Sequence, residues 1–420
     1  MSIEKIKVLK FGGTSVKNPQ RLVHVAQIIA REKAHKCIVV VSAMGQTTDT
    51  LVKLASRCSQ TPNPRELDVL LATGEQQAIA LLSIVLSDLG VRARSFTGAQ
   101  LGIITEANYG NAEILSIDKS KIEEAFQTHD VIVVAGFQGV TATGDITTLG
   151  RGGSDTSAVA LAAATRAELC EIYTDVDGIF TADPNIINGA LQHSILSYED
   201  CLELAARGAQ VIHPRAVECA RENSIDIAVR SVFNPENEGT LITSGSGSTW
   251  ERPGLVGIAV TSGFSLLTIE CQQESDLKEL DDFIRGLVGA VNVQETIWRL
   301  AHTAQVNYII SGLSKPIAER LLQSLAEAEG KPRGKLRLDY VRLSIVGKEA
   351  SLAPRESKTI EEIQTWLAQN SLLSTTSELS LSIYLEEAKA VEVWNQLHEI
   401  LKPQLTRGEE ARTALVGSTC

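Results

Sequence analysis

The chain has 420 residues, of which 44% are hydrophobic, 21% charged and 4% aromatic, with a formal net charge of −12. This length exceeds one ordinary hydrophobic core, so we expect two or three domains of a soluble globular protein. The acidic balance argues against a nucleic acid or an anionic membrane as partner, and the few aromatic residues argue against base stacking. A nucleotide is still compatible, because a triphosphate needs local hydrogen-bond donors and not a basic surface.

The seven cysteines form no CxxC pair and no Cys/His cluster. An odd number of scattered cysteines predicts free thiols in a reducing compartment. Residues 1–5 lead directly into an apolar run without the core of a signal peptide, and no apolar stretch reaches membrane-spanning length. We therefore expect a cytoplasmic protein.

Strand and helix signals alternate through the first half of the chain. Apolar, β-branched runs predict strands at 6–11, 37–42, 131–135 and 169–173, and helical periodicity predicts a long helix over about 65–89. This alternation predicts an α/β fold with a largely parallel sheet covered by helices on both faces. Ligands of such sheets bind beyond the carboxyl ends of the strands, where the glycine-rich and polar segments of this sequence fall.

A loop-rich stretch near residue 245 predicts a domain boundary, giving a first domain at 1–245. Beyond it, the order strand, helix, strand, strand, helix occurs twice and predicts small α+β modules at 255–330 and 335–404. The expected strands lie at 255–270, 291–299, 304–311, 336–347, 371–376 and 378–385, and the expected helices at 276–288, 315–328, 358–369 and 386–401. Residues 405–420 are polar and are expected to form a disordered tail.

The first candidate site is the segment KFGGTS at residues 10–15, which ends the first predicted strand. Here Lys10 can balance phosphate charge while Gly12 and Gly13 present backbone N–H groups to phosphate oxygens. The spacing is not that of a Walker A loop. The alternative interpretation is a strand-terminating turn with a solvated lysine.

The second candidate is the segment GRGGSD at residues 150–155, which opens an alanine-rich helix expected to reach Ala167. Ser154 or Asp155 is the expected helix cap, and a well-capped helix is the alternative interpretation. A cap does not account for three glycines and an arginine directly before it. Close approach of the backbone to a ligand accounts for the glycines, and recognition of a carboxylate accounts for Arg151. Together the two segments favour phosphoryl transfer between two anionic substrates.

Two weaker candidates lie between these segments. Gly74 and Glu75 occur inside an apolar helical stretch, where glycine costs about 1 kcal/mol relative to alanine. They indicate either close approach of a ligand whose ammonium binds Glu75, or a helix–helix contact, and the sequence leaves both open. Thr47 follows a buried strand and could face the same crevice, although by itself its segment is only a plausible loop.

Residues 173–184, with the sequence YTDVDGIFTADP, follow the strand at 169–173. The turn signals at 177–178 and 183–184 predict a hairpin and loop, and the functional interpretation is a lid that encloses a nucleotide. His213 precedes Pro214 at the start of another helix, and it is interpreted as structural because no serine or cysteine partner pattern accompanies it.

In combination these segments resemble the aspartate kinase family of the amino acid kinase superfamily over residues 5–245. The resemblance is carried by KFGGTSV, VVVSAMGQTTD, TGE, GFQG, LGRGGSDTSA, YTDVDGIFTADP, RGAQVIHPRAVE and the VRS at 229–231. It implies the amino-acid-kinase fold and transfer of the ATP γ-phosphoryl to the β-carboxylate of L-aspartate, which gives 4-phospho-L-aspartate and ADP. It also implies Mg²⁺ bound with ATP and no metal ligand supplied directly by the protein. A carboxylate acceptor is already ionised at pH 7, so the protein's task is positioning and charge neutralisation.

The resemblance assigns roles residue by residue. It implies that Lys10 and Asp155 form the catalytic centre. The implied aspartate site consists of Thr47, Glu75, Arg151, Gly152, Gly153 and Ser154. The implied nucleotide site consists of Lys10, Phe11, Gly12, Gly13, Thr174, Asp175, Phe180, Asp183, Asn185 and Gln210.

Two positions depart from the family pattern on the nucleotide side. Asn185 stands where an arginine is usual, and Gln210 stands where a lysine is often found. Losing both cations should weaken triphosphate binding, since each charge-assisted contact contributes about 1.5–3 kcal/mol. Our hypothesis is that Arg207 replaces one of them.

The two C-terminal modules resemble ACT regulatory modules in layout. Their first turns, at 271–276 and 347–354, lack the Pro-Gly pair that commonly holds an effector amino acid in such modules. We therefore expect ACT-like folds that help form a homodimer or a larger assembly. An amino-acid effector stays a candidate partner, with inhibition by lysine or threonine expected to be weak, altered or absent.

Three functions are compatible with these observations. The first is an ATP-dependent aspartate kinase, and the second is a kinase of another amino-acid carboxylate, because Arg151 and Glu75 read only the head group. The third is a catalytically weak subunit kept for regulation or assembly, favoured by Asn185 and Gln210 but disfavoured by the retention of Lys10 and Asp155. An oxidoreductase is disfavoured because no G-x-G-x-x-G follows a strand.

Overall fold

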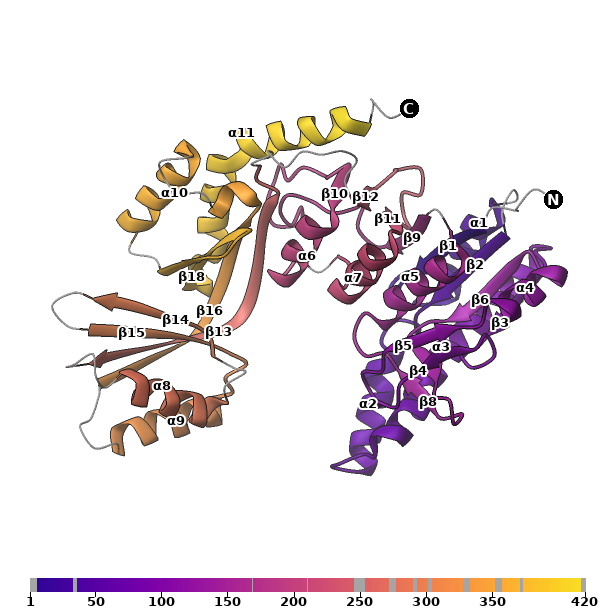
Figure 1. Ribbon diagram of the computed structural model, residues 1–420, viewed down its shortest axis with the longest axis horizontal. Helices are drawn as coiled ribbons and strands as arrows, with labels where there is room; N and C mark the ends of the chain where they lie inside the picture. The colour runs from indigo at the N-terminus through magenta and orange to yellow at the C-terminus, as the bar shows by residue number, and fades with distance from the viewer. Residues whose placement is uncertain are drawn as a thin grey trace.

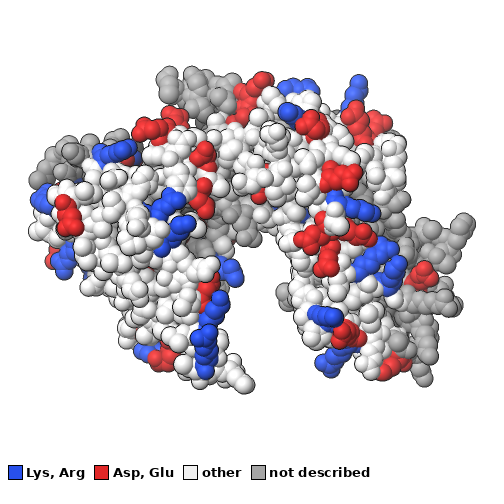
Figure 2. Space-filling model, turned by 180° about the vertical axis from the view of Figure 1, so that it is seen from behind, with Lys and Arg blue, Asp and Glu red and all other residues white. Residues whose placement is uncertain are grey.

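The computed structural model describes residues 6–32, 36–167, 169–209, 211–244, 254–271, 277–289, 293–300, 304–327, 333–351, 357–370 and 373–416. Figure 1 shows an N-terminal lobe and a C-terminal lobe that meet near α6 and β13. The space-filling surface is hollowed between the two lobes, and on the face in Figure 2 acidic and basic side chains are interspersed.

The N-terminal lobe follows the predicted alternation of strands and helices. In chain order its elements are β1 (Ile6–Phe11), α1 (Pro19–Ala30), β2 (Lys36–Val41), α2 (Thr47–Cys58), α3 (Pro64–Asp88), β3 (Ala93–Phe96), β4 (Ile103–Thr105), β5 (Ile114–Ile117), α4 (Lys119–Thr128), β6 (Val131–Ala135), β7 (Gln138–Val140), β8 (Ile146–Thr148), α5 (Gly153–Thr165), β9 (Leu169–Thr174), β10 (Ile195–Ser197), α6 (Tyr198–Ala206), α7 (Pro214–Asn223), β11 (Asp226–Ser231) and β12 (Thr240–Thr243).

Its main sheet has eight strands in the order β10-β12-β11-β9-β1-β2-β6-β3. All neighbouring pairs from β11 to β3 are parallel, whereas β12 runs antiparallel to β11. A smaller four-stranded sheet, β5-β4-β7-β8, lies beside it. The predicted α/β fold with a mainly parallel sheet is thereby confirmed.

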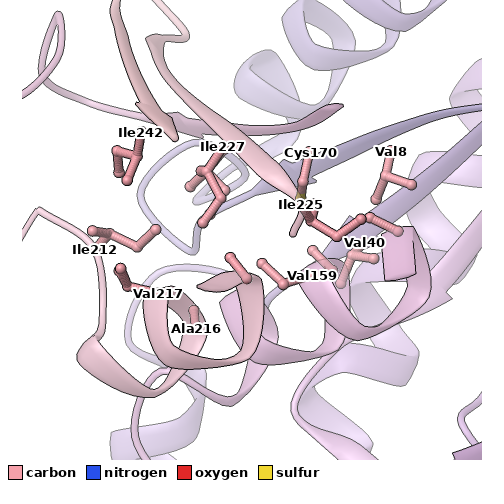
Figure 3. Close-up of a cluster of buried hydrophobic side chains, with 14 of the residues drawn as sticks. Val8, Val40, Val159, Cys170, Ile212, Ala216, Val217, Ile225, Ile227 and Ile242 are labelled. Carbon is pink, nitrogen blue, oxygen red and sulfur yellow. The ribbon is translucent and has the colours of Figure 1, made fainter. Parts of the chain in front are cut away.

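The central strands are buried on both faces, as their continuous apolar runs predict. On one face, Val8 and Val40 pack against Val159 of α5 and, further along, Ile227 packs near Val217 of α7 (Figure 3). On the opposite face, side chains of α1 and α3 cover the same strands. The sheet is therefore a rigid platform whose strand ends carry the site.

Helix α3 is, within the described part of the chain, the single helix long and apolar enough by length and composition to cross a membrane. It serves here as a core helix: Ala78 and Leu82 are fully buried against the main sheet. Asp68 and Glu75 on the same helix are also buried. Core helices of globular proteins share this composition, so the helix is explained by its packing.

The C-terminal lobe repeats strand, helix, strand, strand, helix, as predicted. Its elements are β13 (Gly257–Cys271), α8 (Leu277–Val288), β14 (Val293–Leu300), β15 (Ala304–Ser311), α9 (Lys315–Glu327), β16 (Arg333–Val346), η3 (Lys348–Ser351), α10 (Lys358–Gln369), β17 (Leu373–Thr376), β18 (Ser380–Glu386), η4 (Glu387–Lys389) and α11 (Ala390–Val416). The two modules share one six-stranded sheet, ordered β14-β15-β13-β16-β18-β17, in which the long strands β13 and β16 pair antiparallel at the centre.

The expectation of a disordered tail at residues 405–420 is wrong for residues 405–416, which belong to α11, whereas residues 417–420 lie outside the described residues. Helix α11 continues to Val416, because Leu401 and Leu405 are buried in the core of the second module. Gln404 is fixed by a hydrogen bond from its Nε2 to Thr359 Oγ1, at 2.7 Å. Beyond this point Glu409 contacts the N-terminal lobe, so a polar sequence is held by tertiary contacts that its composition does not reveal.

Candidate active site

Lys10 and Asp155 meet at the carboxyl end of the main sheet. Lys10 is the penultimate residue of β1, and Asp155 lies in the first turn of α5, which packs directly on β1. Lys10 Nζ lies 2.5 Å from Asp155 Oδ1, and the two side chains are only 11% and 13% exposed. A lysine and a carboxylate from segments that are 145 positions apart therefore form one nearly buried ion pair.

Gly13 allows the loop after β1 to pack against the loop after β2. A Cβ at Gly13 would lie 2.7 Å from the carbonyl oxygen of Ala43, and Gly13 O accepts a hydrogen bond from Gly45 N. Gly12 lies beside the lysine, since a Cβ there would be 3.5 Å from Lys10 Nζ. Phe11 is fully buried and stacks on Tyr173 with ring centroids 4.8 Å apart, so its side chain supports the site from the core.

Helix α5 begins differently from our prediction. Neither Ser154 nor Asp155 caps it: the N-cap residue is Gly152, with φ 69° and no side-chain cap bond. This left-handed conformation favours glycine, and α5 begins directly after it, at Gly153, which is earlier than a cap at Ser154 or Asp155 predicts. Asp155 is consequently available to pair with Lys10, and Arg151 remains exposed in the preceding loop.

The start of α5 is packed tightly against the loop after β6. Cβ atoms at Gly136 and Gly153 would lie 2.8 Å from Ser154 Oγ and 2.9 Å from Phe137 Cδ2, respectively. Phe137 itself adopts a positive φ of 66°, a conformation that costs about 1–2 kcal/mol for a non-glycine residue. Its N–H donates to Ser157 Oγ on α5. The GFQG motif thus supports the helix start, a role that sequence reasoning missed.

Two side chains, the buried Asp68 and the half-buried Arg215, hold the segment that leads into Arg151. Asp68 of α3 accepts hydrogen bonds from Thr148 N at 2.8 Å and Thr148 Oγ1 at 2.7 Å. Arg215 of α7 donates through its two terminal nitrogens to the carbonyl oxygens of Leu149 and Ala112. Sequence reasoning missed both residues, since an aspartate and an arginine on separate helices carry no local motif.

His213 packs directly on Gly152, which agrees with its structural interpretation. A Cβ at Gly152 would lie 2.1 Å from His213 Cγ, and His213 Nδ1 accepts the N–H of Arg215 at the N-terminus of α7. We expect Gly152→Ala to weaken aspartate binding at least tenfold and to lower stability by about 1–2 kcal/mol, because the new methyl meets the ring and strains the backbone. Steady-state kinetics and thermal unfolding measure these effects.

Gly144→Ala is the matched control for this substitution. Gly144 also has a positive φ, of 94°, but a Cβ there meets nothing within 4 Å. It should therefore lower stability through backbone strain alone and leave aspartate affinity unchanged. Equal losses of affinity in both variants would contradict a specific role for the Gly152–His213 contact.

Glu75 lies beside this centre with one oxygen engaged and one without a hydrogen-bond partner among the described residues. Glu75 Oε1 accepts the N–H of Ala43 at 2.9 Å, whereas Oε2 is buried and unbonded. Gly74 packs against Ala43 and Thr47, because a Cβ there would lie 2.9 Å from Ala43 Cβ. The helix-contact alternative therefore accounts for Gly74, and the unpaired oxygen makes Glu75 a candidate ligand for a cation.

Burial raises the pKa of Glu75 to about 7, and the N–H of Ala43 only partly opposes this. If an ammonium binds the ionised carboxylate, affinity for L-aspartate should weaken by up to about tenfold per pH unit below about 7. Folded-state stability should fall as pH rises from the ordinary value of 4.5 to about 7, since ionisation of the buried carboxyl is unfavourable. Calorimetric titrations across this range measure the first effect.

Glu75→Gln should bind aspartate weakly at every pH and lose this dependence. Glu66→Gln on the same helix is the control, because the Glu66 side chain is 64% exposed and bonded to Arg65. If the pH dependence of aspartate binding persisted unchanged in Glu75→Gln, a titratable group other than Glu75 would be its cause.

Thr47 is the first residue of α2, where its hydroxyl donates to Met44 O at 2.6 Å. On the far side of Lys10, Thr174 ends β9 and its hydroxyl donates to the exposed Asp175 at 3.2 Å. Phe180 and Asp183 follow in the hairpin predicted at 173–184, where Phe180 bridges to Gln192. In the sheet order β9-β1-β2, Thr174 therefore ends one of the two strands that flank β1, and Thr47 follows the other.

Asn185 forms a turn with Asp183 instead of supplying a cation. The backbone N and side-chain Nδ2 of Asn185 donate to Asp183 Oδ1 at 2.9 and 3.1 Å. Gln210 lies outside the described residues. The hypothesis that Arg207 replaces a missing cation is wrong: its Nε pairs with Glu203 at 2.8 Å, and its terminal nitrogens donate to Ser377 and Ser382 of the C-terminal lobe.

No group of three or more His, Cys, Asp or Glu side chains that could hold a metal occurs among the described residues. A metal bound through substrate phosphates and water needs at most one or two protein carboxylates. Asp155 is the nearly buried carboxylate at the centre of the site. Asp155 therefore has the chemistry to contact Mg²⁺ that arrives with a nucleotide.

A parallel α/β sheet with a Lys10–Asp155 pair between the end of β1 and the start of α5 fits the class of small-molecule kinases, which the following comparisons establish. The model of the amino acid kinase family matches residues 5–231. An aspartokinase of Geobacillus stearothermophilus is 40% identical over 94% of this chain and 96% of its own length. An aspartokinase of Thermus thermophilus is 39% identical over 93% and 97%. The chain therefore belongs to the amino acid kinase family, among its aspartokinases.

Solved structures agree with this assignment. Aspartate kinase from Synechocystis is 32% identical and covers 96% of this chain and 69% of its own, with a TM-score of 0.54. E. coli aspartokinase III, in complex with lysine and aspartate, covers 94% of this chain and 99% of its own with a TM-score of 0.73. At 23% identity the latter supports the fold alone.

Proposed function

We propose that the protein transfers the γ-phosphoryl group of ATP to the β-carboxylate of L-aspartate and releases 4-phospho-L-aspartate and ADP. The observation that carries this proposal is the nearly buried Lys10–Asp155 pair, set between glycine-rich backbone and the start of α5. A carboxylate oxygen of aspartate attacks the γ-phosphorus while the bond to the β,γ-bridging oxygen breaks. The acceptor is already ionised, so this step needs no general base.

Lys10 neutralises charge on the transferring group, and Asp155 orients Lys10 through the 2.5 Å contact. Gly12 and Gly13 provide backbone N–H groups near the phosphates, as at other anion-binding turns. Mg²⁺ bound to ATP adds further charge neutralisation when present. Arg151 binds the α-carboxylate of aspartate with Gly152, Gly153 and Ser154 at the helix start. Glu75 binds its ammonium, and Thr47 also contacts the amino acid.

The nucleotide lies along Thr174, Asp175, Phe180 and Asp183 in this proposal. Asn185 supplies amide donors but no positive charge. Gln210 is likewise uncharged, and it stands at the second position where a cation is expected. With Arg207 held by the C-terminal lobe, Lys10 is the principal protein cation for the phosphates, so ATP affinity should be modest.

Further expectations are proposed for the protein as a whole. The C-terminal modules act as ACT-like modules that assemble two or more copies, and lysine or threonine inhibits weakly or not at all, since neither strand–helix turn has a Pro-Gly pair. The enzyme works in the cytoplasm.

The test is ADP release together with hydroxamate trapping of the acyl phosphate. L-Aspartate should give both signals, whereas L-glutamate should give neither, because the Arg151-to-Lys10 span would fix the acceptor length. Trapping with glutamate and not aspartate would identify another amino-acid carboxylate as the substrate. No turnover with any acidic amino acid would favour a regulatory subunit.

A further inference from the structure

The last turns of α11 reach the N-terminal lobe through Glu409. Glu409 Oε1 accepts hydrogen bonds from Ser194 N and Ser194 Oγ, each at 2.7 Å, and Oε2 lies 2.8 Å from His193 Nδ1. His193 is fully buried, and the Glu409 side chain is 14% exposed. Burial raises the pKa of Glu409, but the bonds from His193 and Ser194 outweigh it and lower the pKa to about 2. A charged carboxylate is thus fully engaged at this contact.

His193 closes the base of the hairpin that carries Phe180 and Asp183. His193 N donates to Ile179 O at 2.8 Å, and His193 O accepts from Thr240 Oγ1 at 2.6 Å. The same Thr240 Oγ1 accepts the N–H of Ile179 at 2.9 Å. Any movement of His193 would therefore be transmitted to Ile179, the residue directly before Phe180.

The C-terminal lobe touches this hairpin at two more points. Thr181 O accepts the N–H of Ile258, at the start of β13, at 2.7 Å. Ala182 and Ile187 are buried in the core of the second module together with Leu401 and Leu405 of α11. The hairpin is consequently packed between the two lobes, although it belongs to the N-terminal sequence.

We propose that Glu409 is a positioning residue for ATP, acting through His193 and Ser194 on the hairpin at 179–193. This inference rests on the proposed assignment of Phe180 and Asp183 to the nucleotide site. Glu409 itself does not touch substrate. In the proposed nucleotide site few cations contact the triphosphate, so the hairpin contributes a larger share of the binding free energy. If the hairpin had to become ordered when the nucleotide binds, the entropy cost would weaken the observed affinity. Contacts that hold the hairpin in place beforehand therefore strengthen nucleotide binding.

The test compares Glu409→Ala and Glu409→Gln with Glu410→Gln in the full-length enzyme. Glu410 is the next residue on α11 and is exposed, which makes it a matched control. We expect Glu409→Ala to raise KM for ATP about tenfold or more, within the usual range of coupling between sites, with little change in KM for aspartate. Glu409→Gln should show a smaller effect, since its amide oxygen can still accept from Ser194. Glu410→Gln should match the wild type.

A readout independent of the phosphoryl acceptor separates this inference from the proposed reaction. ADP binding, measured by calorimetry, should weaken in Glu409→Ala to the same degree as KM for ATP. If the wild type binds ADP but does not phosphorylate aspartate, the proposed reaction fails while the role of Glu409 is still tested. Unchanged ADP affinity in a folded Glu409→Ala protein, or equal losses for ADP and aspartate, would overturn the role of Glu409.

Ser194→Ala provides a milder variant if Glu409→Ala does not fold. It removes only the hydroxyl bond to Glu409 and keeps the backbone bond. ADP affinity should fall severalfold, and adding Glu409→Gln should produce less than the sum of the single effects, since both act at one contact. Strict additivity would contradict the coupling.

Discussion

Lys10→Met should reduce kcat by about 10²–10³-fold or more, the loss found when one preorganised charge-stabilising donor is removed from a transition state. The methionine keeps much of the side-chain volume but removes the ammonium that lies 2.5 Å from Asp155. Because the carboxylate acceptor is already ionised, charge neutralisation is the main service that the protein provides at this step. Trapping of the acyl phosphate under saturating substrates measures the effect.

Lys7→Met is the control on the same strand. Lys7 points to the opposite face of the sheet, where its Nζ pairs with Glu32 at 2.9 Å and Glu171 at 3.2 Å. It should lower stability, because it leaves the buried Glu171 with fewer partners, while kcat stays near the wild-type value. If Lys7→Met lost as much activity as Lys10→Met, the loss in both variants would be explained by impaired folding and not by a catalytic role of Lys10.

A double substitution separates catalysis from stability at this pair. Lys10→Met alone leaves the nearly buried Asp155 without its cation, which should cost several kcal/mol of folding free energy. Lys10→Met with Asp155→Asn removes that penalty and should recover much of the stability without recovering activity. Denaturant unfolding and kinetics on the same samples test this.

Arg151→Ala should raise KM for aspartate by about 10–150-fold, the equivalent of a lost charge-assisted contact of about 1.5–3 kcal/mol. Stability should change by less than about 0.5 kcal/mol, because Arg151 is exposed in the loop before α5. KM for ATP should change little. The expected signature is thus a large effect on one substrate in a protein of normal stability.

Arg215→Ala gives the contrasting outcome. Arg215 holds two backbone carbonyls beneath the same loop, so its removal should lower stability as well as aspartate affinity. Arg151→Lys should recover only part of the affinity, since an ammonium cannot form the bidentate contact of a guanidinium. If Arg151→Ala affected KM for ATP instead, Arg151 would belong to the nucleotide side.

The fold of the N-terminal lobe was predictable because its signals are local. The run Val39–Val41 in β2 and the strand β9 alternate with helical segments, and a doubly covered parallel sheet follows from that order. The Lys10 and Arg151 segments were found in the same way, since strand ends and helix starts carry recognisable glycines. They meet because α5 packs on β1, so that the first turn of α5 lies at the end of that strand.

The predictions that were wrong concern residues whose roles depend on backbone conformation or on partners far away in the sequence. Ser154 and Asp155 both have cap chemistry, but the left-handed Gly152 takes the cap position and leaves Asp155 for Lys10. Arg207 has the charge to replace a missing cation, yet Glu203 and the C-terminal lobe hold it. No local pattern distinguishes these outcomes, because each was decided by what packs nearby.

The sequence by itself determined the α/β platform, the repeated C-terminal modules and the residue types of the site, since periodicity and glycine placement act over short spans. Only the tertiary structure decided which polar residues face the site. One example is the segment before Arg151, which is held by hydrogen bonds to Asp68 and from Arg215. The ordered end of α11 is another, because Leu405 is buried in a core that includes Ala182 and Ile187, and Glu409 contacts His193, which lies 216 residues earlier in the chain.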